Sequence, residues 1–223
     1  MIQKVIDDDF KIVVPTIFSE LESHGYSRVS IPNFEKEDLV KLSYYFGEVI
    51  SPGRNAEVVT EIYTDNVKGE KIVPLHNDKS YWRIPPRFMF FYFKSIQGIQ
   101  GGETIISNMQ SAYNELAENE KKILNEYTMP IKSPNNRDES KTDALLVNFL
   151  NGKLTFFRLR LDLFNAEIKE LNRWYQIIKD NSITLSFKEG ELFILDNWTF
   201  AHGRNETTFS ENGFRNIFRT LVV

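Results

Sequence analysis

The chain has no cysteine and only three histidines, His24, His76 and His202, among its 223 residues. Without cysteine it can form neither a disulfide framework nor a thiolate metal site. It lacks an apolar run long enough to span a bilayer. Its first ten residues include three consecutive aspartates and lack the apolar core of a signal peptide. We therefore expect a cytoplasmic protein with no membrane partner.

A basic surplus is also missing. The chain carries 27 Lys and Arg against 31 Asp and Glu, which gives a formal net charge of -4. Nucleic-acid-binding domains usually carry excess positive charge, so we expect no nucleic-acid partner. What the chain has in quantity is aromatic residues, with 18 Phe and 9 Tyr. Such residues suit an aromatic-rich β core, and the length suits one domain over residues 1–223.

Hydrophobic patterning predicts strands through the centre of the chain and helices before and between them. The predicted helices cover residues 15–24, with Pro15 at the helix start, and 34–49, 111–126 and 164–178. The predicted strands cover residues 26–31, 58–63, 85–97, 104–107, 145–150, 154–160, 183–187, 191–195 and 214–222. Gly98 to Gly102 is expected to be a turn, and Asn151-Gly152 is typical of a hairpin turn.

The order of these elements shows no alternation of strand and helix and no internal repeat. A mainly β fold with flanking helices, the double-stranded β-helix or jelly roll, accounts for it best. The N-terminal segment, about residues 1–57, is expected to pack on this core. The highly polar stretch 133–143 is expected to be a mobile loop and is a candidate lid.

Two of the three histidines lie in settings that predict a metal site. His76 and Asp78 are two residues apart at the end of a predicted strand, so their side chains point to the same side. They would offer an imidazole nitrogen and a carboxylate oxygen to a common point. His202 would supply a third ligand from a distant strand. Two histidines and one carboxylate on one face of an octahedral metal are typical of non-haem Fe(II) oxygenases.

Two arginines on the last predicted strand point to an anion site. Arg215 and Arg219 are four residues apart, so both can face the inside of the barrel. A buried guanidinium without an anion is very costly, and guanidinium groups bind carboxylates through paired hydrogen bonds. The alternative is that either arginine forms a surface salt bridge on an edge strand.

Three blocks of sequence resemble the TauD/TfdA-type, clavaminate-synthase-like Fe(II)/2-oxoglutarate dioxygenases. The blocks are Leu75-His76-Asn77-Asp78 with Tyr81-Trp82 and Pro85-Pro86-Arg87, then Gly101-Gly102-Glu103-Thr104 with Ser107-Asn108, then Gly190-Glu191-Leu192 with Leu195-Asp196-Asn197, Ala201-His202-Gly203-Arg204, Arg215 and Arg219. They span residues 74 to 221 in the family's order. A lone His-x-Asp would be a weak signal, but this combination is specific.

The resemblance implies a jelly roll and a set of ligands. Fe(II) would be held by His76, Asp78 and His202, with 2-oxoglutarate as co-substrate and O2 as oxidant. Arg215 would bind the distal carboxylate of 2-oxoglutarate with help from Thr104, and Arg219 would lie nearer the substrate. Related halogenases replace the carboxylate ligand by a small residue, so with Asp78 this chain resembles the hydroxylating branch.

Four further residues are candidates for the substrate pocket. Tyr81 and Trp82 follow the first two ligands and could line the pocket or belong to the core. Arg158 shares a predicted strand face with Arg160 and could contact an anion. Arg204 could contact the co-substrate or support its loop.

The expected function is hydroxylation of an unactivated C–H bond in a small anionic metabolite or in a free or carrier-bound amino acid. Desaturation and cyclisation use the same cofactors and stay open. The main alternative is a jelly-roll protein that binds metal or ligand without oxidising it, such as a sensor or a degenerate dioxygenase. A cupin-like isomerase or lyase is a weaker alternative. The sequence does not indicate an oligomeric state.

Overall fold

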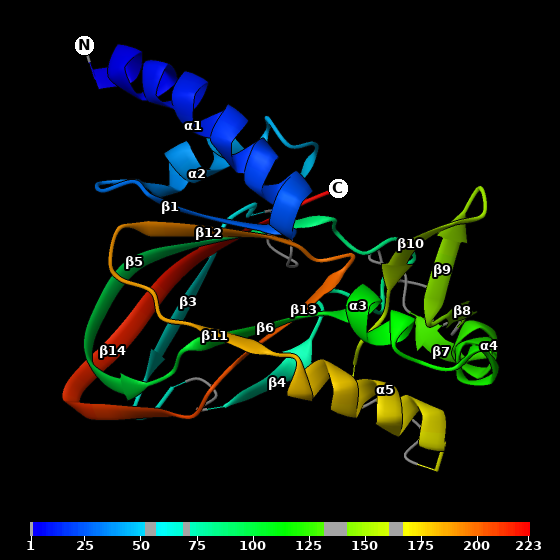
Figure 1. Ribbon diagram of the computed structural model, residues 1–223. Coiled ribbons are helices and arrows are strands. Elements are labelled where there is room, and N and C mark those ends of the chain that lie inside the picture. The colour runs from blue at the N-terminus through cyan, green and yellow to red at the C-terminus, as the bar shows by residue number, and fades with distance from the viewer. Residues whose placement is uncertain (1, 52–56, 69–71, 132–141, 161–166) are drawn as a thin grey trace.

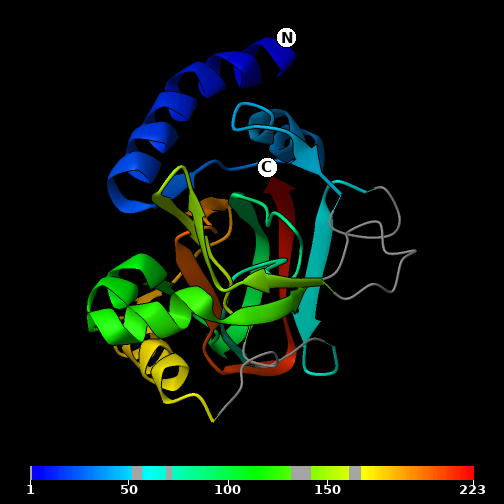
Figure 2. The same ribbon diagram turned by 90° about the vertical axis from the view of Figure 1, so that its right-hand side faces the viewer.

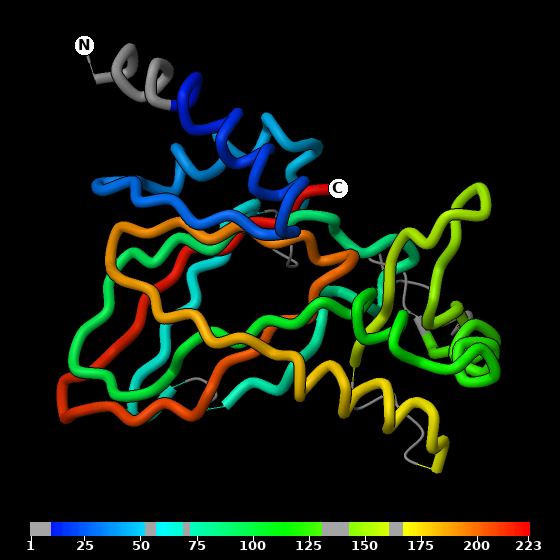
Figure 3. Tube along the Cα trace, in the orientation of Figure 1, coloured from blue at the N-terminus to red at the C-terminus, as the bar shows by residue number. Residues whose placement is uncertain are grey.

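Two antiparallel sheets face each other in the computed structural model, which describes residues 2–51, 57–68, 72–131, 142–160 and 167–223 (Figures 1 and 3). In the larger sheet the strand order is β1 (Tyr26–Ser30), β12 (Glu191–Asp196), β5 (Phe88–Gly101), β14 (Thr207–Val222), β2 (Val49–Ile50), and β3 (Thr60–Asp65) also pairs with β14. In the smaller sheet it is β11 (Ile183–Leu185), β6 (Thr104–Asn108), β13 (Phe200–Arg204), β4 (Val73–His76). The predicted jelly roll is confirmed.

Helices cover the outside of the sheets. The amino-terminal helices α1 (Ile2–His24) and α2 (Lys36–Ser43) lie over the outer face of the larger sheet (Figures 1 and 2). The helices α3 (Met109–Asn114), α4 (Glu118–Glu126) and α5 (Lys169–Asp180) gather beside one end of the smaller sheet. There they adjoin two hairpins, β7 (Thr128–Ile131) with β8 (Thr142–Leu145) and β9 (Val147–Leu150) with β10 (Lys153–Phe157). No described helix has the length and apolar character needed to cross a membrane.

Strand β5 shows why the aromatic run sits at the centre of the larger sheet. Phe88, Phe90 and Tyr92 pack with the amino-terminal helices, whereas Phe93 belongs to the core between the sheets, with Phe91 packed against it. Burial on both faces explains why the run is continuously apolar instead of alternating. The strand predicted over residues 85–97 is therefore confirmed as part of β5.

The end of β5 departs from prediction. Residues 98–101 were expected to turn, but the strand continues to Gly101 because its last residues pair with Thr207–Phe209 of β14. The turn comes at Gly102, whose φ of +74° places it in the left-handed region that favours glycine. An added Cβ there would lie 2.6 Å from Thr207 Oγ1, so only glycine fits.

Several helix boundaries also differ. Helix α1 begins at Ile2, so Pro15 lies inside it and the prediction that Pro15 starts the helix was wrong. Helix α2 covers only eight of the residues predicted over 34–49. The helix predicted over 111–126 is two helices, because Glu120 bonds back to the backbone N–H of Ala117 and begins a new one. The predicted turn at Asn151-Gly152 is confirmed, with both residues at positive φ.

Most of the candidate lid lies outside the described residues. The structure describes only residues 142 and 143 of the stretch 133–143, and these belong to β8.

Candidate active site

The register of the smaller sheet brings His76 and His202 together. They face each other directly in the antiparallel pair of β4 and β13, and their ring centroids are 4.4 Å apart. Asp78 follows two residues after β4. One potential ligand atom from each of these three side chains lies within 4.8 Å of the others. Among the described residues, the structure thus forms the two-His, one-carboxylate cluster that the sequence predicted.

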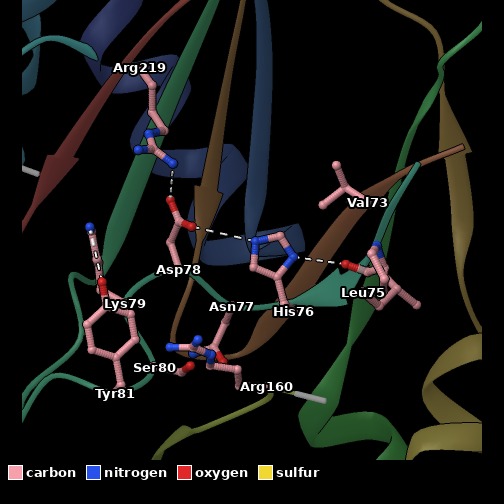
Figure 4. A pocket seen from close by; sticks show the side chains of 11 residues that line it. Val73, Leu75, His76, Asn77, Asp78, Lys79, Ser80, Tyr81, Arg160 and Arg219 are labelled. Atoms are coloured by element: carbon pink, nitrogen blue, oxygen red, sulfur yellow. Dashed lines mark hydrogen bonds and ion pairs between the residues drawn. The ribbon is translucent and has the colours of Figure 1, made fainter. Parts of the chain in front are cut away.

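Hydrogen bonding fixes which nitrogen His76 presents to the cluster. Its Nδ1 lies 2.9 Å from the carbonyl oxygen of Pro74, and because a carbonyl can only accept, Nδ1 carries the proton. Nε2 is therefore the nitrogen available to a metal, and it lies 3.6 Å from Asp78 Oδ1 (Figure 4). A backbone acceptor behind a histidine in this way orients the ring for metal binding.

His202 is buried, and its Nδ1 has no hydrogen-bond partner. Burial, together with the nearby His76, lowers the pKa of His202 to about 3. Its imidazole is therefore neutral near pH 7, the form that binds metals.

Asp78 is held as a carboxylate by its neighbours. Burial alone would raise its pKa, but Arg219, followed by His76 and His202, outweighs burial and keeps the pKa well below its ordinary value. The imidazoles of His76 and His202 and the ionised carboxylate of Asp78, with one ligand atom of each within 4.8 Å of the others, form a donor set that fits Fe(II).

Two buried asparagines, Asn77 and Asn197, hold Asp78 in place, and neither role was predicted from the sequence. The Asn197 side chain accepts from the backbone N–H of Asp78 at 2.7 Å and donates to its carbonyl at 3.0 Å and to that of Pro86 at 2.8 Å. The Asn77 side chain donates to the carbonyls of Phe157 and Asn197. The turn between β12 and β13 is thereby joined to the metal-binding segment after β4. The only indication of the Asn197 role in the sequence was that Asp196-Asn197 comes shortly before the strand that carries His202.

An inner cavity of about 170 Å³ opens on one side of the cluster, and His202, Thr104, Arg204 and Arg215 line it. Arg215 is 5% exposed, donates to the Gly102 carbonyl at 3.2 Å and lies over the Phe93 ring. Burial, with a contribution from Arg204, lowers its pKa to about 9, so it stays charged near pH 7. No described carboxylate forms an ion pair with it, so this cavity is suited to an anionic ligand.

An outer cavity of about 550 Å³ also adjoins the cluster (Figure 4). His76 and Asp78 line both cavities, as does Arg219. The outer cavity is also lined by Lys79, Tyr81 and Arg160.

Arg219 was predicted to contact substrate, and the structure pairs it with Asp78 instead. Its Nη1 donates to Asp78 Oδ2 at 2.8 Å, which joins β14 of the larger sheet to the segment after β4 (Figure 4). The pair leaves Asp78 Oδ1 directed toward His76. Any contact between Arg219 and substrate stays a prediction.

Arg158 is placed away from the cavities. It is 1% exposed and donates to the carbonyls of Ser80, Trp82, Arg83 and Leu145. Neither Arg158 nor Trp82 lines the inner or the outer cavity. The shared strand face predicted for Arg158 and Arg160 is wrong, because β10 ends at Phe157 and the alternation of sides ends with it. Arg160 lines the outer cavity, and the geometry gives Arg158 a structural role.

A jelly roll with two imidazoles and a carboxylate between its sheets defines the class of mononuclear non-haem iron enzymes. Residues 14–145 match the model of the taurine catabolism dioxygenase TauD, TfdA family. The match covers more than half of the chain, and the chain belongs to this family. The matched segment contains His76, Asp78 and Thr104. His202 and Arg215 lie outside the matched segment, and the fold brings them to the site. No curated protein matches the chain.

Solved structures share the fold at low sequence identity. PvcB from Pseudomonas aeruginosa is 19% identical with a TM-score of 0.70, over 93% of this chain and 79% of that one. An asparagine oxygenase in complex with Fe(II), 2S,3S-3-hydroxyasparagine and succinate is 14% identical with a TM-score of 0.71, over 96% and 79%. A taurine dioxygenase from Burkholderia xenovorans is 16% identical with a TM-score of 0.71, over 94% and 80%. With its family, this chain is an Fe(II)- and 2-oxoglutarate-dependent oxygenase.

Proposed function

We propose that the chain hydroxylates an unactivated C–H bond of a small anionic metabolite or of a free or carrier-bound amino acid. The observation that carries the proposal is that the cluster of His76, Asp78 and His202 adjoins two cavities, both of which His76 and Asp78 line. The inner cavity suits the co-substrate and the outer cavity suits the substrate, so the two would meet at the metal.

Each residue of the cluster has a role in this proposal. His76, Asp78 and His202 would hold Fe(II), which would activate O2, the oxidant, with 2-oxoglutarate as the co-reductant. The Pro74 carbonyl and the Asn197 side chain keep His76 and Asp78 in orientation. Because three protein ligands occupy one face of the metal, the opposite face remains for the small molecules.

Arg215 and Thr104 would bind 2-oxoglutarate in the inner cavity. The buried guanidinium of Arg215 would pair with the distal carboxylate, and the Thr104 hydroxyl lines the same cavity. A charge-assisted pair in a buried site is strong and directional, so it would orient the keto acid toward the cluster. Arg204 lies on this side as well, which favours a supporting role there over a contact with substrate.

The cationic lining of the outer cavity supports an anionic or zwitterionic substrate. The asparagine oxygenase of similar fold holds a hydroxylated amino acid together with succinate, which supports an amino acid as one such substrate here. The same site could catalyse desaturation or cyclisation, and the products of turnover would separate these reactions from hydroxylation.

Succinate formation tests the proposal against a protein that only binds metal or ligand. Purified protein would be given Fe(II), 2-oxoglutarate and O2 with a panel of amino acids and small carboxylates and sulfonates. We expect succinate that depends on 2-oxoglutarate and rises with one compound of the panel. His76→Ala should abolish it, whereas His24→Ala should not, because His24 lies at the end of α1 outside the cluster. Metal binding without any succinate would favour the non-catalytic alternative.

A further inference from the structure

The two oxygens of the Asp78 carboxylate face different partners. Oδ1 lies 3.6 Å from Nε2 of His76, another candidate metal ligand. Oδ2 accepts a hydrogen bond from Arg219 Nη1 at 2.8 Å (Figure 4). The Asp78 side chain is only 12% exposed, so little water reaches the carboxylate. The protein therefore gives each oxygen its own partner before a metal binds.

The number of oxygens that Asp78 gives to a metal decides how many coordination positions stay open. A carboxylate can bind a metal through one oxygen or through both. Two histidines and one carboxylate oxygen occupy one face of an octahedral metal and leave three adjacent positions. A chelating keto acid needs two of them, and O2 needs the third. A second oxygen from Asp78 would occupy a position that one of these reactants needs.

The backbone at both ends of the pair between Arg219 and Asp78 is held in place. Arg219 lies inside β14, where it is paired with Phe91 of β5 on one side and with Thr60 of β3 on the other. Asn197 holds the backbone of Asp78 through hydrogen bonds of 2.7 and 3.0 Å. The pair therefore joins two groups whose positions are set before a metal arrives, which a precise metal site requires.

The same pair argues against a different use of Arg219. Its side chain lines both cavities, so an anionic substrate could reach it. Leaving a buried carboxylate without its cation is strongly unfavourable, so a substrate that drew Arg219 away would leave Asp78 with that cost. The pairing therefore favours a role of Arg219 toward the metal ligand over a role in holding substrate.

We infer that Arg219 is a positioning residue for the metal site. By holding Oδ2, it restricts Asp78 to binding the metal through Oδ1 alone, so that three adjacent positions stay open for the reactants. The inference rests on the proposed function for the assignment of His76, Asp78 and His202 as ligands. It does not depend on which substrate is bound or on which bond is oxidised.

Counting the water molecules on bound Mn(II) tests this inference without catalysis. Mn(II) would be added to the protein without 2-oxoglutarate, and the broadening of its EPR lines in 17O-enriched water would give the number of water ligands. We expect three in the wild type. Arg219→Met should lose one, because the released Oδ2 can take its position, whereas Arg219→Lys keeps a cationic donor and should retain it. The matched control is Arg28→Met, which removes the pair of Arg28 with Glu191 outside the cluster and should keep three waters.

Two results would overturn the inference alone. One is that Mn(II) on the wild-type protein carries only two waters, which would mean that both oxygens of Asp78 bind; this measurement decides even if Arg219→Met does not fold. The other is that Arg219→Met keeps all three waters. Both results leave the ligand assignment and the proposed function in place. Asp78→Ala should weaken Mn(II) binding, and an unchanged affinity in that variant would overturn the ligand assignment and the inference together.

Discussion

At the scale of single residues, Asn197 shows how a metal ligand is positioned by a side chain that does not touch the metal. It is fully buried and bonds to both backbone groups of Asp78 and to the carbonyl of Pro86. Asp78 lies beyond the end of β4, so no strand pairing fixes its backbone. The asparagine supplies the hydrogen bonds that a neighbouring strand would otherwise give.

We expect Asn197→Ala to weaken metal binding about 10- to 100-fold, because outer partners of metal ligands typically contribute that much. It should also lower the free energy of unfolding by roughly 1–3 kcal/mol, since buried polar groups of the backbone lose their partners. Co(II) titration and denaturant unfolding measure the two effects.

Asn148→Ala is the matched control for this variant. Asn148 of β9 donates to the backbone carbonyls of Leu145, Leu146 and Phe156, none of which belongs to the metal cluster. It should destabilise the fold and leave metal affinity unchanged. Equal losses of metal affinity in both variants would contradict a positioning role for Asn197.

At the scale of elements, the close approach of β13 to β4 sets the distance between the two histidines. Gly203 follows His202, and a Cβ at this position would lie 2.6 Å from the Val73 carbonyl oxygen. Real Cβ atoms do not approach a backbone oxygen that closely, so any side chain here would push the strands apart.

Gly203→Ala should therefore weaken metal binding at least about tenfold by shifting His202 away from His76. This estimate assumes that the ligand side chains of a metal site must be held within about 0.5 Å of their proper positions. Gly152→Ala serves as control, because Gly152 has a positive φ but open space around it in the β9–β10 turn. The control should cost some stability and no metal affinity. An unchanged Co(II) affinity in Gly203→Ala would argue against a role for this strand contact.

Helix α1 offers a second test at this scale. Pro15 lies inside the helix, where it lacks an N–H to donate and crowds the preceding turn. It is exposed, so replacing it removes no core contact. Pro15→Ala should raise the free energy of unfolding by about 1–3 kcal/mol, measured by denaturant unfolding. If the helix began at Pro15, as the sequence predicted, the same change would be neutral or destabilising.

At the scale of the whole molecule, the metal cluster joins the two sheets. Its histidines belong to the smaller sheet, while Arg219 of the larger sheet pairs with Asp78. A metal that binds only the folded form stabilises it by about 2.7 kcal/mol at 100 times its dissociation constant. For a chain of this length, such a gain corresponds to a rise in Tm of about 5–10 °C.

Thermal unfolding with and without Zn(II) should show this rise in the wild type and in His24→Ala. His76→Ala should lose it. A similar rise in all three proteins would mean that the metal binds elsewhere.

The sequence predicted much of this molecule, because the signals it used are local or depend on residue type. The strand pattern predicted the jelly roll, and His76, Asp78 and His202 were selected because few side chains can bind Fe(II). Arg215 was selected because a barrel strand places it inside, where a guanidinium needs an anion. These inferences need no knowledge of strand register.

The features that the sequence did not predict depend on where strands and helices end and on which distant residues face each other in the fold. The sides to which Arg158 and Arg160 point could not be predicted without knowing that β10 ends at Phe157. The pairing of Arg219 with Asp78 and the bonds from Asn197 link residues more than 100 positions apart. Pro15 favours a helix start, but the chain before it is also helical, and Phe10 and Ile17 on either side of Pro15 belong to the same core cluster.

The most direct test of the central claim is made without O2. Fe(II) and then 2-oxoglutarate are added to the purified protein, and the weak visible absorption of the chelated keto acid is recorded for the wild type and for Arg215→Ala. The account predicts that the band appears in the wild type and that the variant needs at least about tenfold more 2-oxoglutarate, because it lacks the buried charge that pairs with the distal carboxylate. If Fe(II) binds and no band appears at any concentration of 2-oxoglutarate, the assignment of the inner cavity to the co-substrate is wrong.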